Sequence, residues 1–171
     1  MTKRVPDIEK LYNSYSRKLY FTSLRITANS FDAQEAMHDT FIKFYKLKEK
    51  ENIERIDSWL TSVCIRISID ILRKRYREGT FKSELQKEIT KEELIEEPPS
   101  SKTKPEEYTI EAVKESLLLL PDGYRLILSL HLFEGYDYEE IAQITGLKES
   151  SIRSQYMRAK KRLAEMVTKQ I

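Results

Sequence analysis

Polar and basic side chains on one predicted helix near the C-terminus are the residues best suited to carry chemistry. The stretch from Tyr136 to Leu163 reads YDYEEIAQITGLKESSIRSQYMRAKKRL, and the outward side of its second half is rich in arginine, lysine and serine. Arginine and serine at the start of such a helix can hydrogen-bond base edges in the DNA major groove, and later cations can contact phosphates. The alternative is a helical hairpin with a solvated basic face. The predicted DNA-binding residues are Ser150, Arg153, Ser154, Met157, Arg158 and Lys161.

A second basic cluster closes a predicted helix in the first half of the chain. Its cations lie close in sequence to two aromatic residues, Trp59 and Tyr76, and to the charged stretch 48–56. Phosphate attraction would supply affinity, and the aromatic faces could receive unstacked bases. Cations near a helix C-terminus also suit the helix dipole, so a purely structural role stays open. The basic residues of this cluster are Arg66, Arg73, Lys74, Arg75 and Arg77.

The chain offers little for catalysis or for binding a metal. Its one cysteine excludes an internal disulfide, and with two histidines beside it the residues for a zinc site are lacking. The sequence has no glycine-rich phosphate loop, nucleophile triad or metal-ligand cluster. We therefore predict a protein that is not an enzyme and needs no cofactor. Cys64 is expected to be a small core residue.

The composition favours helices. Hydrophobic residues make up 40% and charged residues 34% of the 171 residues, with only 4 Gly and 5 Pro. This mix is too polar for a membrane protein and too apolar for general disorder. No apolar run approaches the roughly 18 residues that a membrane span needs, and the first residues lack the apolar core of a secretory signal. We expect a cytoplasmic protein with no membrane insertion.

The charge pattern divides the chain into two units and a linker. Residues 1–77 carry 16 Lys and Arg against 10 Asp and Glu, residues 78–116 carry 6 against 11, and residues 117–171 carry 8 against 7. The acidic middle also contains consecutive prolines and serines, which disfavour helices. We predict one domain over 1–78, a flexible acidic linker over 79–105 and a second domain over 106–171.

Three amphipathic helices are predicted in the first unit. Asn29 and Ser30 break the first of them, Asp32 is expected to cap the second, and Asp57 or Ser58 the third. Apolar residues recur at steps of three and four in each, which is the period of a one-sided helix. The predicted inward residues are Ile8, Leu11, Tyr15 and Leu19, then Ala33, Met37, Phe41 and Phe44, then Leu60, Val63, Ile67 and Ile71.

In the second unit, a helix is expected to end at Pro121. Asp122 is expected to cap the next helix, which would run through Phe133 and end at Gly135. This places a helical pair ahead of the segment that carries the candidate DNA-binding face.

The last part of the second unit predicts a helix-turn-helix. Asp137 and Glu140 have capping-box spacing, Gly146 supplies a turn that needs a positive φ, and Leu147 would fill the corner. The residues predicted to point inward are Ile141, Ile144, Ile152, Tyr156, Ala159, Leu163 and Met166.

Both units, in this order, resemble the extracytoplasmic-function (ECF) sigma factors of bacterial RNA polymerase. EAMHDTFIKFYK (Glu35–Lys46) and WLTSVCIRISIDILRKR (Trp59–Arg75) resemble the polymerase-binding and −10-recognition segments of region 2, and Leu120–Leu163 resembles region 4. The resemblance covers Leu11–Arg77 and Glu111–Leu163. It implies an all-α protein of two small helical domains joined by an acidic flexible linker, which binds core RNA polymerase and directs promoter-specific initiation.

The resemblance also implies partners and residue roles. The face that docks on the β′ clamp helices would be formed by Glu35, His38, Asp39 and Lys43. The −10 strand would be bound by Lys48, Lys50, Arg55, Trp59, Arg66, Asp70, Arg73, Lys74, Arg75 and Arg77. The outward face of the last helix would read the −35 duplex, with support around His131. The implied partners are the β flap, promoter DNA and an anti-sigma protein.

Two residues depart from the pattern of this family. The chain has His38 where members usually have Gln, and Arg66 where they usually have Asn. Because arginine only donates hydrogen bonds and reaches farther than asparagine, the choice of −10 base stays open. The rival hypothesis is a regulator that binds a duplex operator by itself, which would leave the first unit and the acidic linker without a role.

Overall fold

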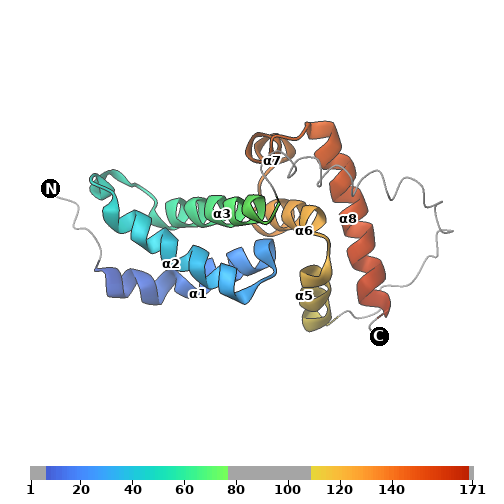
Figure 1. Ribbon diagram of the computed structural model, residues 1–171, viewed down its shortest axis with the longest axis horizontal. Helices are drawn as coiled ribbons and strands as arrows, with labels where there is room; N and C mark the ends of the chain where they lie inside the picture. Colours follow the sequence, from blue (N-terminus) through green and yellow to red (C-terminus); the bar gives the residue numbers. More distant parts are fainter. Residues whose placement is uncertain (1–6, 77–108, 170–171) are drawn as a thin grey trace. The chain divides into compact units, whose positions relative to one another are not determined.

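The described part of the protein consists of helices in two compact units. The structure is a computed structural model that describes residues 7–76 and 109–169. The chain divides into Met1–Tyr76 and Arg77–Ile171. Within the described ranges the regular structure is helical (Figure 1), which confirms the predicted all-α fold with two helical domains. The predicted linker, 79–105, lies outside the described residues, so the proposed domain boundaries stay a prediction.

The first unit is a bundle of three helices. These are α1 (Ile8–Thr27), α2 (Ser30–Lys46) and α3 (Ile56–Arg75), and each packs against the other two. A short 3₁₀ turn, Lys50–Asn52, lies between α2 and α3. The four residues predicted to face inward from α2 are all buried. The shared core contains Leu11, Leu19, Ala36, Met37, Phe41, Phe44, Leu60, Cys64 and Ile67.

Helix α3 is buried more widely than its predicted seam. Leu60 and Ile67 are buried as expected, whereas Val63 is only half-buried. Ile65 and Ile69 are also buried, although they point to other sides of the helix, since successive residues turn by about 100°. The single apolar stripe predicted for α3 therefore does not account for all of its buried residues.

The predicted cap of α2 is wrong. Asn29, with extended backbone at φ −139°, is the cap, and its Oδ1 accepts hydrogen bonds from the backbone N–H groups of Phe31 (2.9 Å) and Asp32 (3.0 Å). Ala28 has a left-handed φ of 51° and turns the chain out of α1 just before this cap. Asp32 thus lies in the first turn of α2, three residues beyond the cap position.

The predicted caps of α3 and of the helix that follows Pro121 are also wrong. Arg55 and Pro121 are the cap residues of α3 and of α6 (Asp122–Leu128), and neither makes a side-chain cap hydrogen bond. Each acidic residue lies one or more positions further in, where negative charge still suits the helix N-terminus. There each binds a cation: the ion pairs are Asp32–Arg75, Asp57–Lys18 and Asp122–Arg125.

A polar seam joins α1 and α3. The Cys64 thiol donates to the carbonyl of Leu19 at 3.4 Å, and the Ser68 hydroxyl donates to Ser23 Oγ at 2.7 Å. Leu19 and Ser23 are one helical turn apart, as are Cys64 and Ser68, so the two contacts lock the register of the two helices. The buried Cys64 is therefore a core residue, as predicted.

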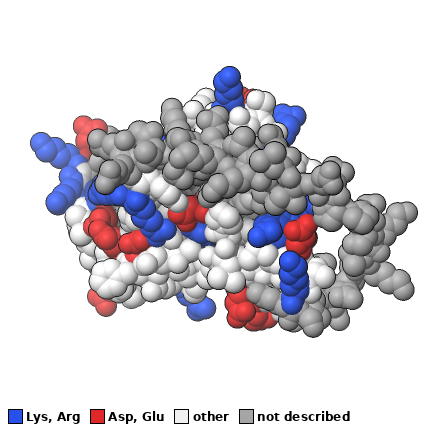
Figure 2. Space-filling view, turned by 45° about the vertical axis from the view of Figure 1, so that its right-hand side comes forward, with Lys and Arg blue, Asp and Glu red and all other residues white. Residues whose placement is uncertain are grey.

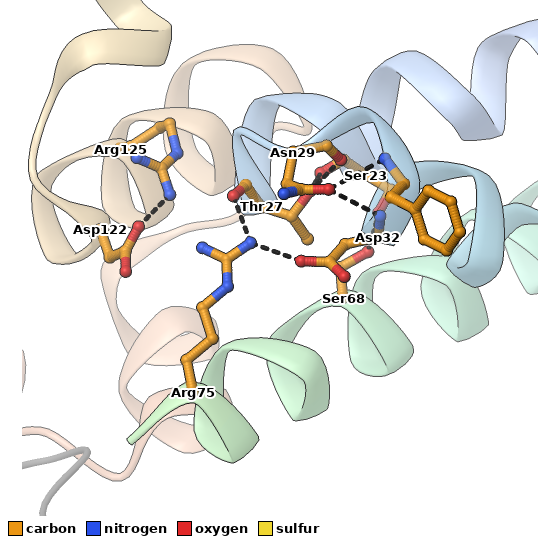
Figure 3. A network of polar contacts seen from close by, with 9 residues as sticks. Ser23, Thr27, Asn29, Asp32, Ser68, Arg75, Asp122 and Arg125 are labelled. Carbon is orange, nitrogen blue, oxygen red and sulfur yellow. Dashed lines mark hydrogen bonds and ion pairs between the residues drawn. The ribbon is translucent and has the colours of Figure 1, made fainter.

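Arg75 continues this seam at the end of α3 (Figure 3). Its Nη2 lies 2.7 Å from the Thr27 carbonyl oxygen at the end of α1 and 2.7 Å from Asp32 Oδ2 near the start of α2. The side chains of Arg75 and Asp32 are 31% and 24% exposed. One guanidinium therefore ties the ends of all three helices together.

The second unit is built around its last helix. Helices α5 (Ile110–Leu119), α6 and α7 (Tyr138–Thr145) all contact α8 (Glu149–Lys169). The helix predicted from residue 122 to Phe133 is α-helical only to Leu128, and residues Ser129–Phe133 form a π-helical turn. Leu120 ends α5 before Pro121, as predicted.

A buried arginine closes the corner between α5 and α6. The Arg125 side chain donates to the Leu120 carbonyl oxygen at 2.7 Å and pairs with Asp122. The Arg125 side chain is only 3% exposed and has lost most of its contact with water. Its hydrogen bond to the carbonyl oxygen and its ion pair compensate for this loss, so the charge can be buried here. The corner that follows Pro121 is thus fixed by a paired buried charge.

The helix-turn-helix has the predicted geometry. The Asp137 side chain accepts from the Glu140 amide at 2.8 Å, and the Glu140 side chain accepts from the Asp137 amide at 2.9 Å, which completes the capping box. Gly146 has a φ of 74°, and Leu147 is buried at the corner. The predicted inward residues of α8 are buried at Ile152, Tyr156 and Ala159 and half-buried at Leu163 and Met166.

The Arg75–Asp32 pair should contribute measurably to the stability of the first unit. We expect Asp32→Ala to lower the free energy of unfolding of this unit by about 1 kcal/mol, because Arg75 loses a partly buried carboxylate partner. Urea denaturation followed by Trp59 fluorescence measures this unit, since Trp59 is the only tryptophan and packs against Phe44. Glu35→Ala, an exposed acid on the same helix, is the control, and equal losses for the two variants would contradict the expectation.

The capping box should set the local stability of α7. We expect Asp137→Ala to cost about 1 kcal/mol of local stability, whereas Asp137→Asn retains an oxygen that can cap and should cost little. Backbone amide hydrogen exchange over 138–145 measures this, with exchange about fivefold faster in the alanine variant. Equally fast exchange in the asparagine variant would show that the carboxylate charge, and not the cap, is responsible.

Candidate nucleic-acid interface

The face of α8 opposite its buried side carries the predicted DNA-binding residues. Arg158 is half-buried, and Met157 is 61% exposed. Within this face the Ser154 hydroxyl donates to the Ser150 carbonyl at 3.1 Å. The helix-turn-helix therefore brings all six predicted residues onto one helix, with five of them exposed: Ser150, Arg153, Ser154, Met157 and Lys161.

Arg153 has two contacts within the unit. Its Nη2 donates to Glu149 Oε1 at 3.1 Å, and its guanidinium carbon lies 5.3 Å from the centre of the Tyr138 ring. Arg153 remains exposed despite these two contacts. Its guanidinium can therefore still form the paired hydrogen bonds with which arginine recognises guanine. The sequence analysis did not predict a role for Tyr138. Its contact with Arg153 joins two helices, and the residue pattern of either helix alone does not indicate such a contact.

An aromatic cluster lies behind Arg153. The His131 ring stacks on Tyr138 with centroids 4.6 Å apart and meets Tyr156 edge-on, also at 4.6 Å. His131 Nδ1 lies 2.7 Å from the Tyr136 carbonyl oxygen, which can only accept, so Nδ1 carries a proton. His131 therefore packs against α7 and α8 through its ring contacts with Tyr138 and Tyr156.

The end of α3 holds most of the second predicted cluster, and its cations differ in their contacts. Arg66 and Lys74 are exposed, and Arg73 pairs with Asp70 at 3.1 Å on the surface. Arg75 binds Asp32 and Thr27 within the bundle, as described above. Arg77 lies outside the described residues.

The stretch between α2 and α3 is partly used by the fold. Lys50 donates to the Tyr45 carbonyl at 2.8 Å and lies 5.7 Å from the Tyr45 ring centre. The half-buried Trp59 packs edge-on against Phe44 at 5.6 Å. Lys48 and Arg55 are exposed. Two predicted contact residues, Lys50 in this stretch and Trp59 in the first turn of α3, are therefore used in packing.

The outer face of α2 is more apolar than predicted. Glu35, His38 and Lys43 are exposed and Asp39 is half-buried, and Tyr12 from α1 places its hydroxyl 3.3 Å from His38 Nε2. The exposed apolar residues of the same helix, missed by the sequence analysis, are Phe31, Ile42 and Tyr45. Their signal was present in the sequence, since they recur at helical spacing opposite the core.

The phenol of Tyr45 remains protonated at neutral pH. Desolvation, followed by the negative charge of Asp7, raises its pKa above the ordinary value.

The described surface carries side chains of both charges (Figure 2). On the described part of the surface in Figure 2, Lys and Arg side chains alternate with Asp and Glu side chains.

Among residues 7–76 and 109–169, no three His, Cys, Asp or Glu side chains gather in a way that could hold a metal ion. In the same ranges no helix combines the length and apolar character that a membrane crossing requires.

Comparison with known families matches both units. Residues 11–78 match the family model of sigma-70 region 2, and residues 110–163 match that of sigma-70 region 4. Together these ranges cover most of the chain and coincide with the two helical units.

Curated relatives match nearly the whole chain. The ECF sigma factor SigM of Bacillus subtilis is 25% identical, over 91% of this chain and 92% of the relative. The sigma factor SigV of the same species is 29% identical, over 91% of this chain and 88% of the relative. SigE of Mycolicibacterium smegmatis is 23% identical over 96% of this chain, which spans 63% of that relative.

A solved structure has the same fold. It is the sigma factor RpoE of Bartonella quintana in complex with the anti-sigma factor NepR, with a TM-score of 0.56 and 20% identity over 96% of this chain and 98% of that chain. The chain therefore belongs to the ECF sigma factors of RNA polymerase, a non-enzymatic family that directs transcription initiation, and it carries their region 2 and region 4 domains.

Proposed function

We propose that this sigma factor reads promoter DNA at two points while it is bound to core RNA polymerase. The C-terminal unit reads the −35 element as a duplex, and the N-terminal unit binds the −10 element as a single strand. The observation that carries the proposal is the exposed face of α8, where Arg153, Ser154 and Met157 lie opposite the buried Ile152, Tyr156 and Ala159. A rigid helix with such a face suits the major groove.

Contacts at the −35 element divide into two kinds. Arg153 and Ser154 lie near the start of α8, where side chains of a helix-turn-helix meet base edges, and Met157 can pack on a thymine methyl group. Lys161 lies further along the helix, at the position expected for a phosphate contact. The first group should therefore set sequence preference, and Lys161 should add affinity for any sequence.

Capture of an unpaired base accounts for opening at the −10 element. Arg66, Lys74 and Arg73 on α3, with Lys48 and Arg55 from the preceding stretch, are surface cations that can bind the phosphates of a single strand. Unstacking a base costs a few kcal/mol, and stacking on an aromatic or guanidinium plane returns about 1–3 kcal/mol per base. The free energy gained by capturing one base thus offsets the cost of opening about one base step. Contacts with polymerase must supply the free energy for the remaining steps.

Docking on polymerase is assigned to the outer face of α2. The charged residues implied by the family resemblance, Glu35, His38, Asp39 and Lys43, lie beside exposed Ile42 and Tyr45. A mixed charged and apolar helix face suits another helical surface, such as the β′ clamp helices. The C-terminal unit would contact the β flap.

Regulation by an anti-sigma protein follows the solved relative. RpoE of Bartonella quintana was crystallised with the anti-sigma factor NepR. We extend this to the present chain as a protein that acts in the cytoplasm and is held inactive by a partner covering its polymerase-binding faces.

Arg153→Ala tests the −35 assignment. We expect affinity for a matched −35 site to fall by about 1–3 kcal/mol and discrimination at the base pair that Arg153 contacts to be lost, because a paired base contact disappears. The measurement is promoter binding by the holoenzyme at fixed salt, over a duplex library randomised at the −35 positions.

Lys161→Ala is the matched control for Arg153→Ala. It should weaken all sequences about equally and reduce the salt dependence by roughly one phosphate contact. If Arg153→Ala behaves in the same way, Arg153 contacts phosphate and not a base edge.

Promoter opening tests the division of work between the subunits. We expect permanganate reactivity of −10 thymines when the chain is combined with core polymerase, and none with the chain alone, because the captured base barely offsets unstacking. Opening by the isolated chain would refute the balance given above. Binding of intact duplex sites without polymerase, with no initiation when polymerase is present, would favour the stand-alone regulator instead.

A further inference from the structure

The side chain that should read the −35 element rests on a tyrosine from the other helix of the helix-turn-helix. Arg153 projects from α8, and its guanidinium carbon lies 5.3 Å from the centre of the Tyr138 ring, at the start of α7. We infer that Tyr138 is a positioning residue that holds the Arg153 guanidinium in its base-reading orientation. This inference rests on the proposed −35 function of α8.

The backbone position of Tyr138 is fixed by the capping box. Tyr138 is the first residue of α7 and directly follows Asp137, whose side chain accepts from the Glu140 amide at 2.8 Å. The Glu140 side chain returns a contact to the Asp137 amide at 2.9 Å. Both hydrogen bonds flank Tyr138, so its Cα has little freedom relative to the rest of α7.

The ring of Tyr138 is fixed by two other rings. His131 stacks on it with centroids 4.6 Å apart and planes within 18°, and Tyr156 from α8 lies 5.9 Å away. His131 is itself held, because its Nδ1 donates to the Tyr136 carbonyl at 2.7 Å. The half-buried Tyr138 ring is therefore a rigid surface that belongs to the core on one side and meets Arg153 at the protein surface.

Arg153 needs such a surface because its side chain is long. A free arginine samples many rotamers, and binding a base edge with two parallel hydrogen bonds requires one orientation of the guanidinium plane. The Tyr138 ring contacts the guanidinium from α7, and Glu149 Oε1, at 3.1 Å, contacts it from α8. The guanidinium is therefore held from both helices. Ordering before binding reduces the entropy lost on binding.

Replacement of Tyr138 should therefore weaken sequence discrimination through Arg153 alone. We expect Tyr138→Leu to reduce the ratio of affinities for matched and altered −35 sites by about two- to fivefold, the range set by an exposed cation–ring contact. Tyr138→Phe retains the ring and should keep the ratio of the wild-type protein. The measurement is holoenzyme binding to the randomised −35 duplex library at fixed salt.

A double-mutant cycle separates positioning from general structural damage. In an Arg153→Ala background, Tyr138→Leu should leave the affinity ratio unchanged, because the side chain that it positions is gone. An equal loss of ratio with and without Arg153 would overturn the inference and make Tyr138 a structural residue only. Amide exchange over 138–145 reports whether the leucine variant has loosened α7.

The outcomes also distinguish this inference from the proposed function. If Arg153→Ala lowers discrimination but Tyr138→Leu does not, the −35 function stands and the positioning role falls. If Arg153→Ala leaves discrimination unchanged, both fall, because there is then no base contact to position.

Discussion

Burial of one side of α8 is the constraint on which the proposed reading of the promoter depends. Ile152, Tyr156 and Ala159 face α5, α6 and α7 and are almost fully buried. Because successive helical residues turn by about 100°, burial of these positions forces Arg153 and Ser154 to the surface. A shift of α8 by one residue would rotate the reading face away from DNA and expose apolar side chains. The packing that stabilises the second unit therefore also sets the geometry of the face that we propose for DNA recognition.

In the first unit, the fold and the nucleic-acid surface draw on the same kinds of residue. Arg75 joins the ends of three helices because a guanidinium can donate to both a carbonyl oxygen, on Thr27, and a carboxylate, on Asp32. Lys50 and Trp59 likewise pack against Tyr45 and Phe44. A cluster of cations at the end of a helix is thus divided between those that hold the helix in place and those that remain at the surface.

Acidic residues at the helix starts illustrate how local and tertiary effects combine. Asp32, Asp57 and Asp122 each lie just inside a helix, where negative charge is favourable on its own. Tertiary structure adds a cation to Asp32 from the end of α3 and to Asp57 from α1. The charges at the starts of α2 and α3 therefore also connect these two helices to their neighbours.

The sequence by itself determined the helical class, the three-helix and helix-turn-helix patterns, the capping box at Asp137 and the turn at Gly146, because these depend on residues within one or two helical turns of each other. It also placed the six side chains of the reading face on one side of α8. The tertiary structure alone decided that Arg75 at the end of α3 binds Asp32 and Thr27, and that Tyr138 lies under Arg153. In each case the residue that makes the contact lies on another helix. The periodicity of apolar residues along one helix shows which side of that helix is buried, but not which side chains of a neighbouring helix it contacts.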